Sequence, residues 1–197
     1  MLPFPKLSSD TILAPMAKIT DIAFRELCKQ YGAGLTVTEM ISANDLSRND
    51  PQALQELQQL KSESKPRWAQ LYGRNMENFI AATKMVQGHA DILDLNFGCP
   101  YHKIIAQGLG CALMDRPGKI RQIVQNVVAN SKMPVTCKIR LGMDAQNITV
   151  IEVAQKCEES GAALITVHAR TQKQEYGGTA DWSWIKKVKE AVKIPVC

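Results

Sequence analysis

The chain has 197 residues, of which 45% are hydrophobic and 22% charged, so it can build a core within the size of one ordinary domain. No apolar run approaches the ~18 residues needed to cross a bilayer, and the N-terminal residues lack the pattern of a secretory signal. The net charge of +5 would favour a polyanionic partner without requiring one. We therefore expect a cytoplasmic protein that does not associate with membranes.

Short apolar segments bounded by turn-forming residues alternate with longer helical patterns along the whole chain. Strands are predicted at residues 12–14, 35–38, 67–71, 92–95, 135–139, 164–168 and 194–197. Helices are predicted at residues 21–31, 75–87, 119–131, 147–160 and 182–192. This order is typical of βα units that form a parallel sheet covered by helices.

Two of these helices carry clear end signals. Asp21 precedes the first helix and Gly32 follows it, while Asn147 is predicted to cap the helix at 147–160 and Gly161 to end it. The apolar stripe predicted to face the sheet from that helix is Ile148, Ile151, Ala154 and Cys157.

Two architectures fit about six βα units and a seventh strand: an open doubly wound sheet or a TIM (β/α)₈-type barrel. The open sheet would usually carry GxGxxG or a P-loop near its first strand, and neither motif occurs. The sequence therefore favours an incomplete α/β barrel, because a complete one needs eight units and typically ~250 residues. Two strand edges would then need cover from another segment or chain.

Candidate functional residues follow the predicted strands, at the carboxyl face where barrel enzymes place their sites. They are Pro15, Met16, Gln70, Asn96, Cys99, Lys138, Arg140 and His168. None of the six cysteines has CxxC spacing, so we expect neither a metal site nor a disulfide framework.

Several of these residues have ordinary structural alternatives. A lone cysteine is usually a small core residue, but Gly98 and Pro100 place Cys99 in a turn that points the thiol towards the barrel mouth. Lys138 and Arg140 share one face of a strand, where a ligand is at least as good an explanation as an ion pair. His168 is equally compatible with a ligand contact and a satisfied interior position.

The motifs "LAPMAKITD", "TEM", "AQLYG", "DLNFGCP", "GLGCALM", "CKIRLG" and "HARTQKQEYGGTADW" resemble, in this order and spacing, those of the tRNA-dihydrouridine synthases. The resemblance implies an FMN-bound barrel that reduces selected uridines of tRNA to 5,6-dihydrouridine, with NADPH or NADH as reductant. It also implies tRNA as partner and, for the full-length protein, a monomer without a metal.

The matching motifs imply a role for each candidate residue. Cys99 would be the proton donor, and Pro15, Met16, Gln70, Lys138 and His168 would contact the flavin. Asn96, Arg140 and Tyr176 would hold the flipped uracil. The chemistry agrees, because hydride delivery to uracil C6 requires a proton at C5, and a thiol with an unperturbed pKa of ~8.5 is still protonated at neutral pH.

The family pattern continues with an "NGD"-type segment, a phosphate-binding turn and a helical tRNA-binding domain, which this sequence does not contain. We therefore expect residues 1–197 to be a partial FMN-binding catalytic barrel. Two alternatives remain open at this point. One is a free-pyrimidine flavoenzyme of the dihydroorotate dehydrogenase kind, and the other is an inactive fragment or a module that binds RNA or a partner.

Overall fold

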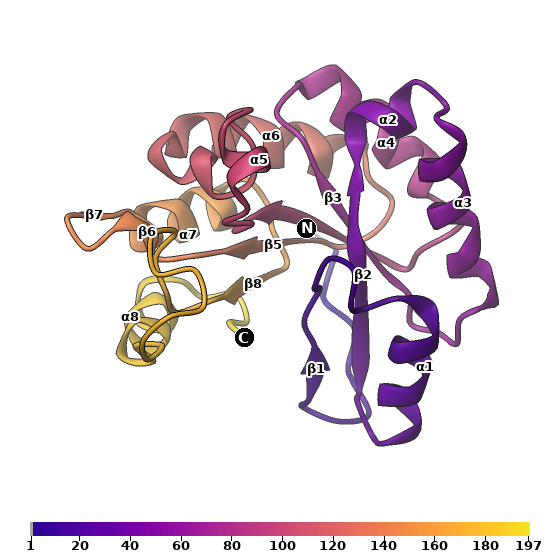
Figure 1. The fold of residues 1–197 in the computed structure, drawn as a ribbon, viewed down its shortest axis with the longest axis horizontal. Helices are drawn as coiled ribbons and strands as arrows, with labels where there is room; N and C mark the ends of the chain where they lie inside the picture. The colour runs from indigo at the N-terminus through magenta and orange to yellow at the C-terminus, as the bar shows by residue number, and fades with distance from the viewer. Residues whose placement is uncertain (1) are drawn as a thin grey trace.

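The computed structural model describes residues 2–197 and contains one curved sheet of six parallel strands (Figure 1). The strand order is β1-β2-β3-β4-β5-β8, so strands that follow one another in the chain lie side by side. The strands are β1 (Ile12–Leu13), β2 (Leu35–Ser42), β3 (Trp68–Tyr72), β4 (Ile92–Phe97), β5 (Val135–Ile139) and β8 (Leu164–Val167). This is an incomplete TIM barrel, as the sequence predicts.

Helices connect the strands and cover the outer face of the sheet. They are α1 (Ile22–Gln30), α2 (Ala43–Ser47), α3 (Pro51–Gln59), α4 (Met76–Val86), α5 (His102–Ile105), α6 (Pro117–Asn130), α7 (Val150–Glu159) and α8 (Ser183–Ala191). Two 3-10 turns, η1 (Leu60–Ser62) and η2 (Gly110–Asp115), and a hairpin of β6 (Gly142–Asp144) and β7 (Asn147–Ile148) complete the structure. None of the helices within residues 2–197 is both long and apolar enough to span a bilayer.

Six of the seven predicted strands and all five predicted helices are confirmed, with ends that differ by a few residues. Asp21 caps α1 by accepting a hydrogen bond from the Phe24 backbone N–H at 2.8 Å. The seventh strand is reduced to a parallel bridge between Ile165 and Val196. Within the described chain, β1 therefore pairs with β2 alone and the Val196 segment pairs with β8 alone.

The prediction for the helix at 147–160 is wrong at its start. Asn147 lies in β7 and the helix begins at Val150, after Thr149. The cause is Asp144, whose Oδ1 accepts hydrogen bonds from the backbone and side-chain amides of Asn147 and so fixes a turn. The buried residues of α7 are consequently Val150, Val153, Ala154 and Cys157, and Ile148 belongs to the hairpin. Gly161 does end the helix, at φ 94°.

The interior of the curved sheet is apolar at the end where the strands begin. Its buried residues are Leu35, Val37, Trp68, Ile92 and Leu164, and the N-terminal segment packs on them through Phe4, Leu7 and Ile12. The rings of Phe4 and Trp68 meet edge to face, with centroids 5.5 Å apart. This cluster closes one end of the interior, so polar groups gather at the other end, where the strands finish.

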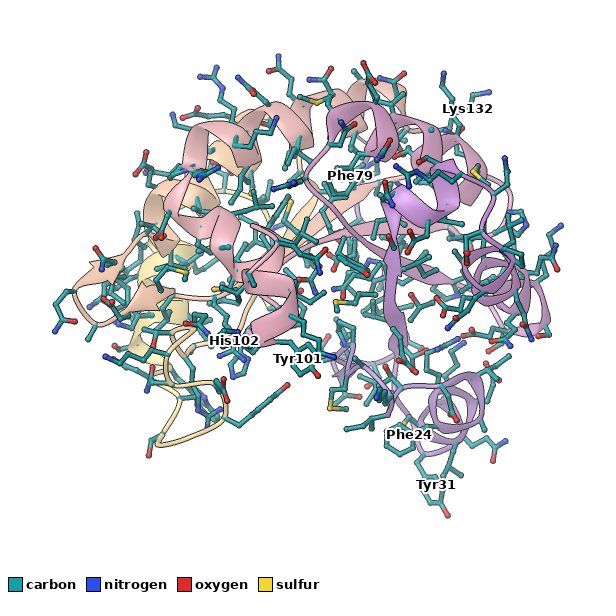
Figure 2. All side chains as sticks on the ribbon, turned by 45° about the horizontal axis from the view of Figure 1, so that its top comes forward. Phe24, Tyr31, Phe79, Tyr101, His102 and Lys132 are labelled. Atoms are coloured by element: carbon teal, nitrogen blue, oxygen red, sulfur yellow. The ribbon has the colours of Figure 1, made fainter. Side chains whose placement is uncertain are left out.

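Helix α1 leaves an apolar stripe uncovered. Phe24, Leu27 and Tyr31 are 36%, 47% and 87% exposed, and Figure 2 shows Phe24 and Tyr31 projecting away from the sheet. The spacing of three and four residues places them on one helical face.

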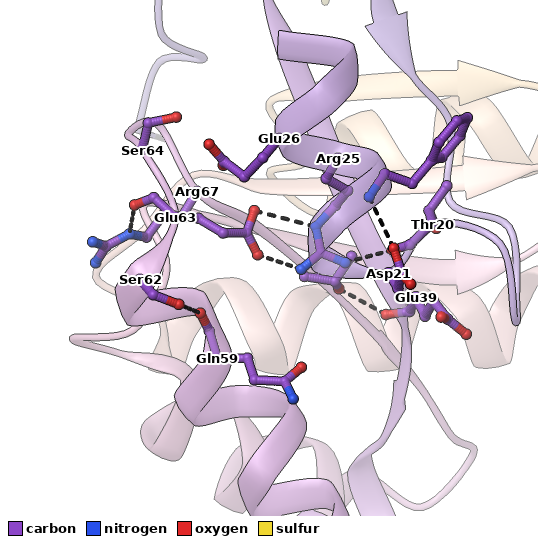
Figure 3. A network of polar contacts seen from close by, with 12 residues as sticks. Thr20, Asp21, Arg25, Glu26, Glu39, Gln59, Ser62, Glu63, Ser64 and Arg67 are labelled. Atoms are coloured by element: carbon purple, nitrogen blue, oxygen red, sulfur yellow. Dashed lines mark hydrogen bonds and ion pairs between the residues drawn. The ribbon is translucent and has the colours of Figure 1, made fainter. Parts of the chain in front are cut away.

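A buried ion pair fixes the loop between β1 and α1 (Figure 3). The Arg25 guanidinium, in α1, binds both carboxylate oxygens of Glu63 and also donates to the Thr20 carbonyl at 2.5 Å. Thr20 in turn accepts a hydrogen bond from the Met16 backbone N–H at 3.0 Å. Arg25 and Glu63 are each 4% exposed. The Arg25 charge depends on Glu63 for compensation, while the Glu63 carboxylate also lies 3.6 Å from Lys29 Nζ.

We expect Glu63→Leu to lower the free energy of unfolding by about 3–5 kcal/mol, because it leaves the Arg25 charge buried without its partner. The double variant Arg25→Met, Glu63→Leu is expected to recover most of this loss, since it removes both charges. Urea denaturation of the two variants and the parent measures both effects. A single variant as stable as the parent would show that the pair does not have this role.

Candidate functional site

The strand register places polar side chains in two rows across the interior. Gln70, Asp94 and Thr136 are direct neighbours on β3, β4 and β5. One step closer to the strand ends, Asn96 on β4 lies beside Lys138 on β5. Side chains at paired positions of parallel strands point to the same face, so both rows enter the space above the apolar cluster.

The first row is joined by hydrogen bonds centred on the buried Asp94 carboxylate. Gln70 Nε2 donates to Asp94 Oδ2 at 2.6 Å, and Thr136 Oγ1 donates to Asp94 Oδ1 at 2.5 Å. Thr136 accepts from the Trp68 indole N–H at 3.1 Å. Burial raises the pKa of Asp94 to about 6, although these two donors and the Lys138 charge oppose the shift.

The same hydrogen-bonded chain reaches the turn that carries Cys99. Asn96 Nδ2 donates to Gln70 Oε1 at 2.9 Å, and Asn96 Oδ1 accepts from the backbone N–H groups of Gly98 and Cys99 at 3.2 and 2.9 Å. A second hydrogen bond holds the turn, because the Cys111 backbone N–H donates to the Cys99 carbonyl at 3.1 Å. A Cβ on Gly110, at φ 57°, would lie 2.8 Å from that carbonyl oxygen, so the close approach requires glycine.

Cys99 is partly exposed. It follows β4 at the end of the interior where the strands finish, which we call the mouth. Burial raises its pKa above the ordinary value, and the positive charges of Arg140 and Lys138 act in the opposite direction. The thiol therefore remains protonated at neutral pH. That state suits a proton donor better than a nucleophile.

The charge of Lys138 interacts with the Asp94 carboxylate, with the like charge of Arg140 and with the Cys99 thiol. Its ammonium makes no hydrogen bond or ion pair with any of residues 2–197. Desolvation lowers its pKa, and the nearby Asp94 carboxylate partly offsets that effect. An amine in this position is available for an acceptor that enters from the mouth.

Arg140 joins the two loops on either side of the mouth. Its Nε donates to the Gly98 carbonyl at 2.9 Å, and its Nη1 donates to the carbonyls of Thr171 and Glu175 at 3.0 and 2.8 Å. The side chain is buried, at 1% exposure, and its guanidinium lies 5.7 Å from the centre of the Tyr176 ring. Arg140 thus fixes the Cys99 turn against the loop after β8.

His168 follows β8 and lies among cations. Burial and the charges of Arg140, Lys138 and Arg170 lower its pKa to about 4, so the ring is neutral at pH 7. Arg170 Nη1 is 3.2 Å from His168 Nε2. Because arginine can only donate, Nε2 accepts and Nδ1 carries the proton.

The remaining predicted residues lie at the rim. The Tyr176 ring is 70% exposed and lies 6.1 Å from the His168 ring, centre to centre. Pro15 and Met16 are half-buried in the loop after β1, with no hydrogen bond to the other candidate residues in the described chain. The structure thus brings Gln70, Asn96, Cys99, Lys138, Arg140 and His168 together and places Tyr176 beside them.

Sequence reasoning missed Asp94 and Thr136, which connect these residues. A signal was present, because Asp94 and Asn96 alternate with Leu93 and Leu95 in an otherwise apolar strand. That alternation places both polar groups on the interior face. It gives no sign of the hydrogen bonds that join them to β3 and β5.

The fold and site together define a class: an incomplete TIM barrel whose donors and cations converge at the carboxyl ends of its strands. A family model described as dihydrouridine synthase (Dus) matches residues 12–197. The chain therefore belongs to the dihydrouridine synthase family.

Curated relatives agree with this assignment. The chain is 43% identical over 192 residues to a protein of Rickettsia bellii described as a probable tRNA-dihydrouridine synthase, with 97% of the chain and 59% of the relative covered. It is 38% identical over 192 residues to tRNA-dihydrouridine synthase B of Shewanella oneidensis, with the same coverage. The chain thus spans about three fifths of the length of these relatives.

A solved structure resembles the fold at low sequence identity. It is a crystal structure described as a lactate oxidase of Pediococcus acidilactici, with a TM-score of 0.54 and 15% identity. The match covers 96% of the chain and 56% of that structure. At this identity the likeness concerns the fold alone.

The charge state of His168 can be tested directly. We expect its imidazole resonances, assigned by comparison with His168→Gln, to titrate near pH 4 instead of near the ordinary 6.5. Arg170→Ala should move that midpoint upwards, because it removes one cation and the donor to Nε2. A His168 midpoint near 6.5 in the parent protein would contradict the described surroundings.

The sign of the stability effect follows from the same shift. Between pH 6.5 and 4 His168 is protonated in the unfolded chain but not in the folded chain. Its contribution therefore lowers the free energy of unfolding as the pH falls. Asp94 acts oppositely in an overlapping range, because its raised pKa makes the folded chain bind the proton more readily. Unfolding curves would combine the contributions of His168 and Asp94, whereas NMR titration follows each residue separately.

Proposed function

We propose that the protein is a flavin-dependent tRNA-dihydrouridine synthase and that residues 1–197 are the FMN-binding part of its catalytic barrel. The family match is the observation that carries the proposal. It is supported by the protonated Cys99 thiol and by Lys138, whose ammonium has no hydrogen-bond or ion-pair partner among the described residues, since both lie near the strand ends. The relatives are longer, and their additional length would cover the two strand edges and supply the remaining barrel units and a tRNA-binding domain.

The residues present fit an FMN ring. Lys138 has no partner within residues 2–197, and its charge would favour an electron-rich heterocycle edge. His168 offers a neutral Nδ1–H, and Gln70 has amide groups in the row beneath. Pro15 and Met16 supply apolar surface from the first loop. Bound reduced flavin, recharged by NADPH or NADH, would supply the hydride for uracil C6.

The side chains of this protein would complete that reaction. The Cys99 thiol would donate its proton to uracil C5, so that one hydride and one proton saturate the 5,6 double bond. Arg140 retains Nη2, which bonds to nothing in residues 2–197, and Asn96 retains one amide hydrogen. Both can meet the uracil carbonyls. Tyr176 would lie against the base at the rim.

A uridine must leave its stack to reach this mouth, at a cost of a few kcal/mol. The exposed groups around the mouth offer compensation through phosphate and base contacts. Tyr101 is 59% exposed, and Figure 2 shows it beside His102, at the start of α5. Basic residues that follow the strands include Lys103 in α5, Arg116 and Lys119 at the start of α6, and Lys173 in the loop after β8.

The test is conversion of uridine in unmodified tRNA by the complete gene product with FMN and a reduced nicotinamide cofactor. We expect Cys99→Ala to lower kcat by roughly 10²–10⁴-fold, the usual contribution of a positioned acid, and to leave flavin absorbance unchanged. Dihydrouridine is measured by mass spectrometry of digested tRNA.

Cys111→Ala is the matched control, because Cys111 is a buried thiol next to the same turn. We expect it to retain activity. Full activity of Cys99→Ala would remove the proposed acid, and turnover of free pyrimidines but not of tRNA would favour an enzyme of the dihydroorotate dehydrogenase kind.

A further inference from the structure

We infer that Asp94 is a positioning residue, whose buried carboxylate orients the Gln70 and Asn96 amides and thereby holds the turn that carries Cys99. The inference deepens the proposed function, since it concerns the placement of the proposed acid. It rests on the direction of each hydrogen bond between the barrel interior and the turn.

Both ends of this hydrogen-bonded chain are groups that can only donate. At one end is the Trp68 indole N–H, which donates to Thr136. At the other end are the backbone N–H groups of Gly98 and Cys99, which donate to Asn96. A chain with donors at both ends needs a group between them that only accepts, and an ionised carboxylate is such a group.

Asp94 occupies that place. Because its Oδ2 accepts from Gln70 Nε2, the Gln70 oxygen must face the other way, towards Asn96. Asn96 then presents its Nδ2 to Gln70 and its oxygen to the turn. Each amide has two orientations of nearly equal shape, and the carboxylate selects the one that leaves an acceptor beneath Gly98 and Cys99.

Burial strengthens the effect of Asp94 on the two amide orientations. Gln70, Asp94 and Asn96 are 1%, 1% and 6% exposed, so water cannot easily replace a missing partner. The alternative fixation of the turn comes from Arg140 and Cys111, which bind the carbonyls of Gly98 and Cys99. The backbone N–H groups of the turn depend on Asn96, and through it on Asp94.

Amide hydrogen exchange of Gly98 and Cys99 tests the inference without any assay of activity. We expect Asp94→Leu, which removes the acceptor at similar volume, to accelerate exchange at these two positions by at least about fivefold. Gln70→Leu interrupts the next link and should have the same local effect. It serves as the second test should Asp94→Leu fail to fold.

The conservative variant gives a graded result. Asp94→Asn keeps one oxygen for Gln70, and its new NH₂ can face Thr136, whose hydroxyl has the Leu93 carbonyl at 3.5 Å as another acceptor. We expect Asp94→Asn to restore most of the protection. Thr36→Val is the control, because the buried Thr36 hydroxyl has no partner within residues 2–197. In this variant the amide exchange rates of Gly98 and Cys99 should equal those of the parent.

Unchanged exchange at Gly98 and Cys99 in Asp94→Leu and Gln70→Leu would overturn the inference. Equal acceleration in every strand would also overturn it, because that pattern indicates general destabilisation. In the complete gene product, Asp94→Leu should lower kcat with little change in the KM for tRNA. A parent protein with no activity on tRNA would refute the proposed function alone, since the exchange result does not depend on it.

Discussion

The structure depends on one constraint: a carboxylate lies in the middle of a barrel interior and takes its side-chain hydrogen bonds from the strands on both sides. Asp94 is 1% exposed and receives hydrogen bonds from both adjacent strands, through Gln70 on β3 and Thr136 on β5. A buried polar group without these partners would cost a large part of the stability of a domain. The pairing therefore fixes three strands together at the level just beneath the mouth.

This layer separates two environments. Beneath it, Trp68 and its apolar neighbours close the interior with the N-terminal segment. Above it, the Lys138 and Arg140 cations lie with the neutral His168 ring at the mouth, and desolvation is the main cause that lowers the pKa of each of the three groups. Such an accumulation of desolvated donors is unfavourable in itself, and it is typical of a site that binds an electron-rich ligand. The hydrogen bonds of Gln70, Asp94 and Thr136 hold the groups at the mouth in fixed positions above the packed interior.

Much of this arrangement could be predicted from the sequence. The alternation of apolar segments and helical patterns, with Asp21 at a helix start and Gly32 after its end, predicted the βα units of a parallel barrel. Residues at the strand ends, from Gln70 to His168, were predicted to converge, because parallel strands end at one edge. The resemblance of motifs to a known family identified the same residues.

Other features could not be predicted because they depend on contacts between distant segments or on competing local bonds. Asn147 is a good helix-capping residue, yet Asp144 captures its amides in a turn. Arg140 was expected to face a ligand, and it also bonds to three backbone carbonyls from two loops that are distant in the chain. The hydrogen bonds that lead from Trp68 to Cys99 cross three strands. No local sequence pattern predicts the amide orientations that these bonds impose.

We propose that the mouth of the barrel holds a protonated thiol at the place where a pyrimidine carbon would need a proton. The most direct measurement is the pKa of Cys99, followed by NMR of protein labelled at the cysteine Cβ and assigned with Cys99→Ser. We expect a titration midpoint above the ordinary thiol range, with the thiol protonated at pH 7. A midpoint below pH 7, which would make Cys99 a thiolate under working conditions, would contradict it.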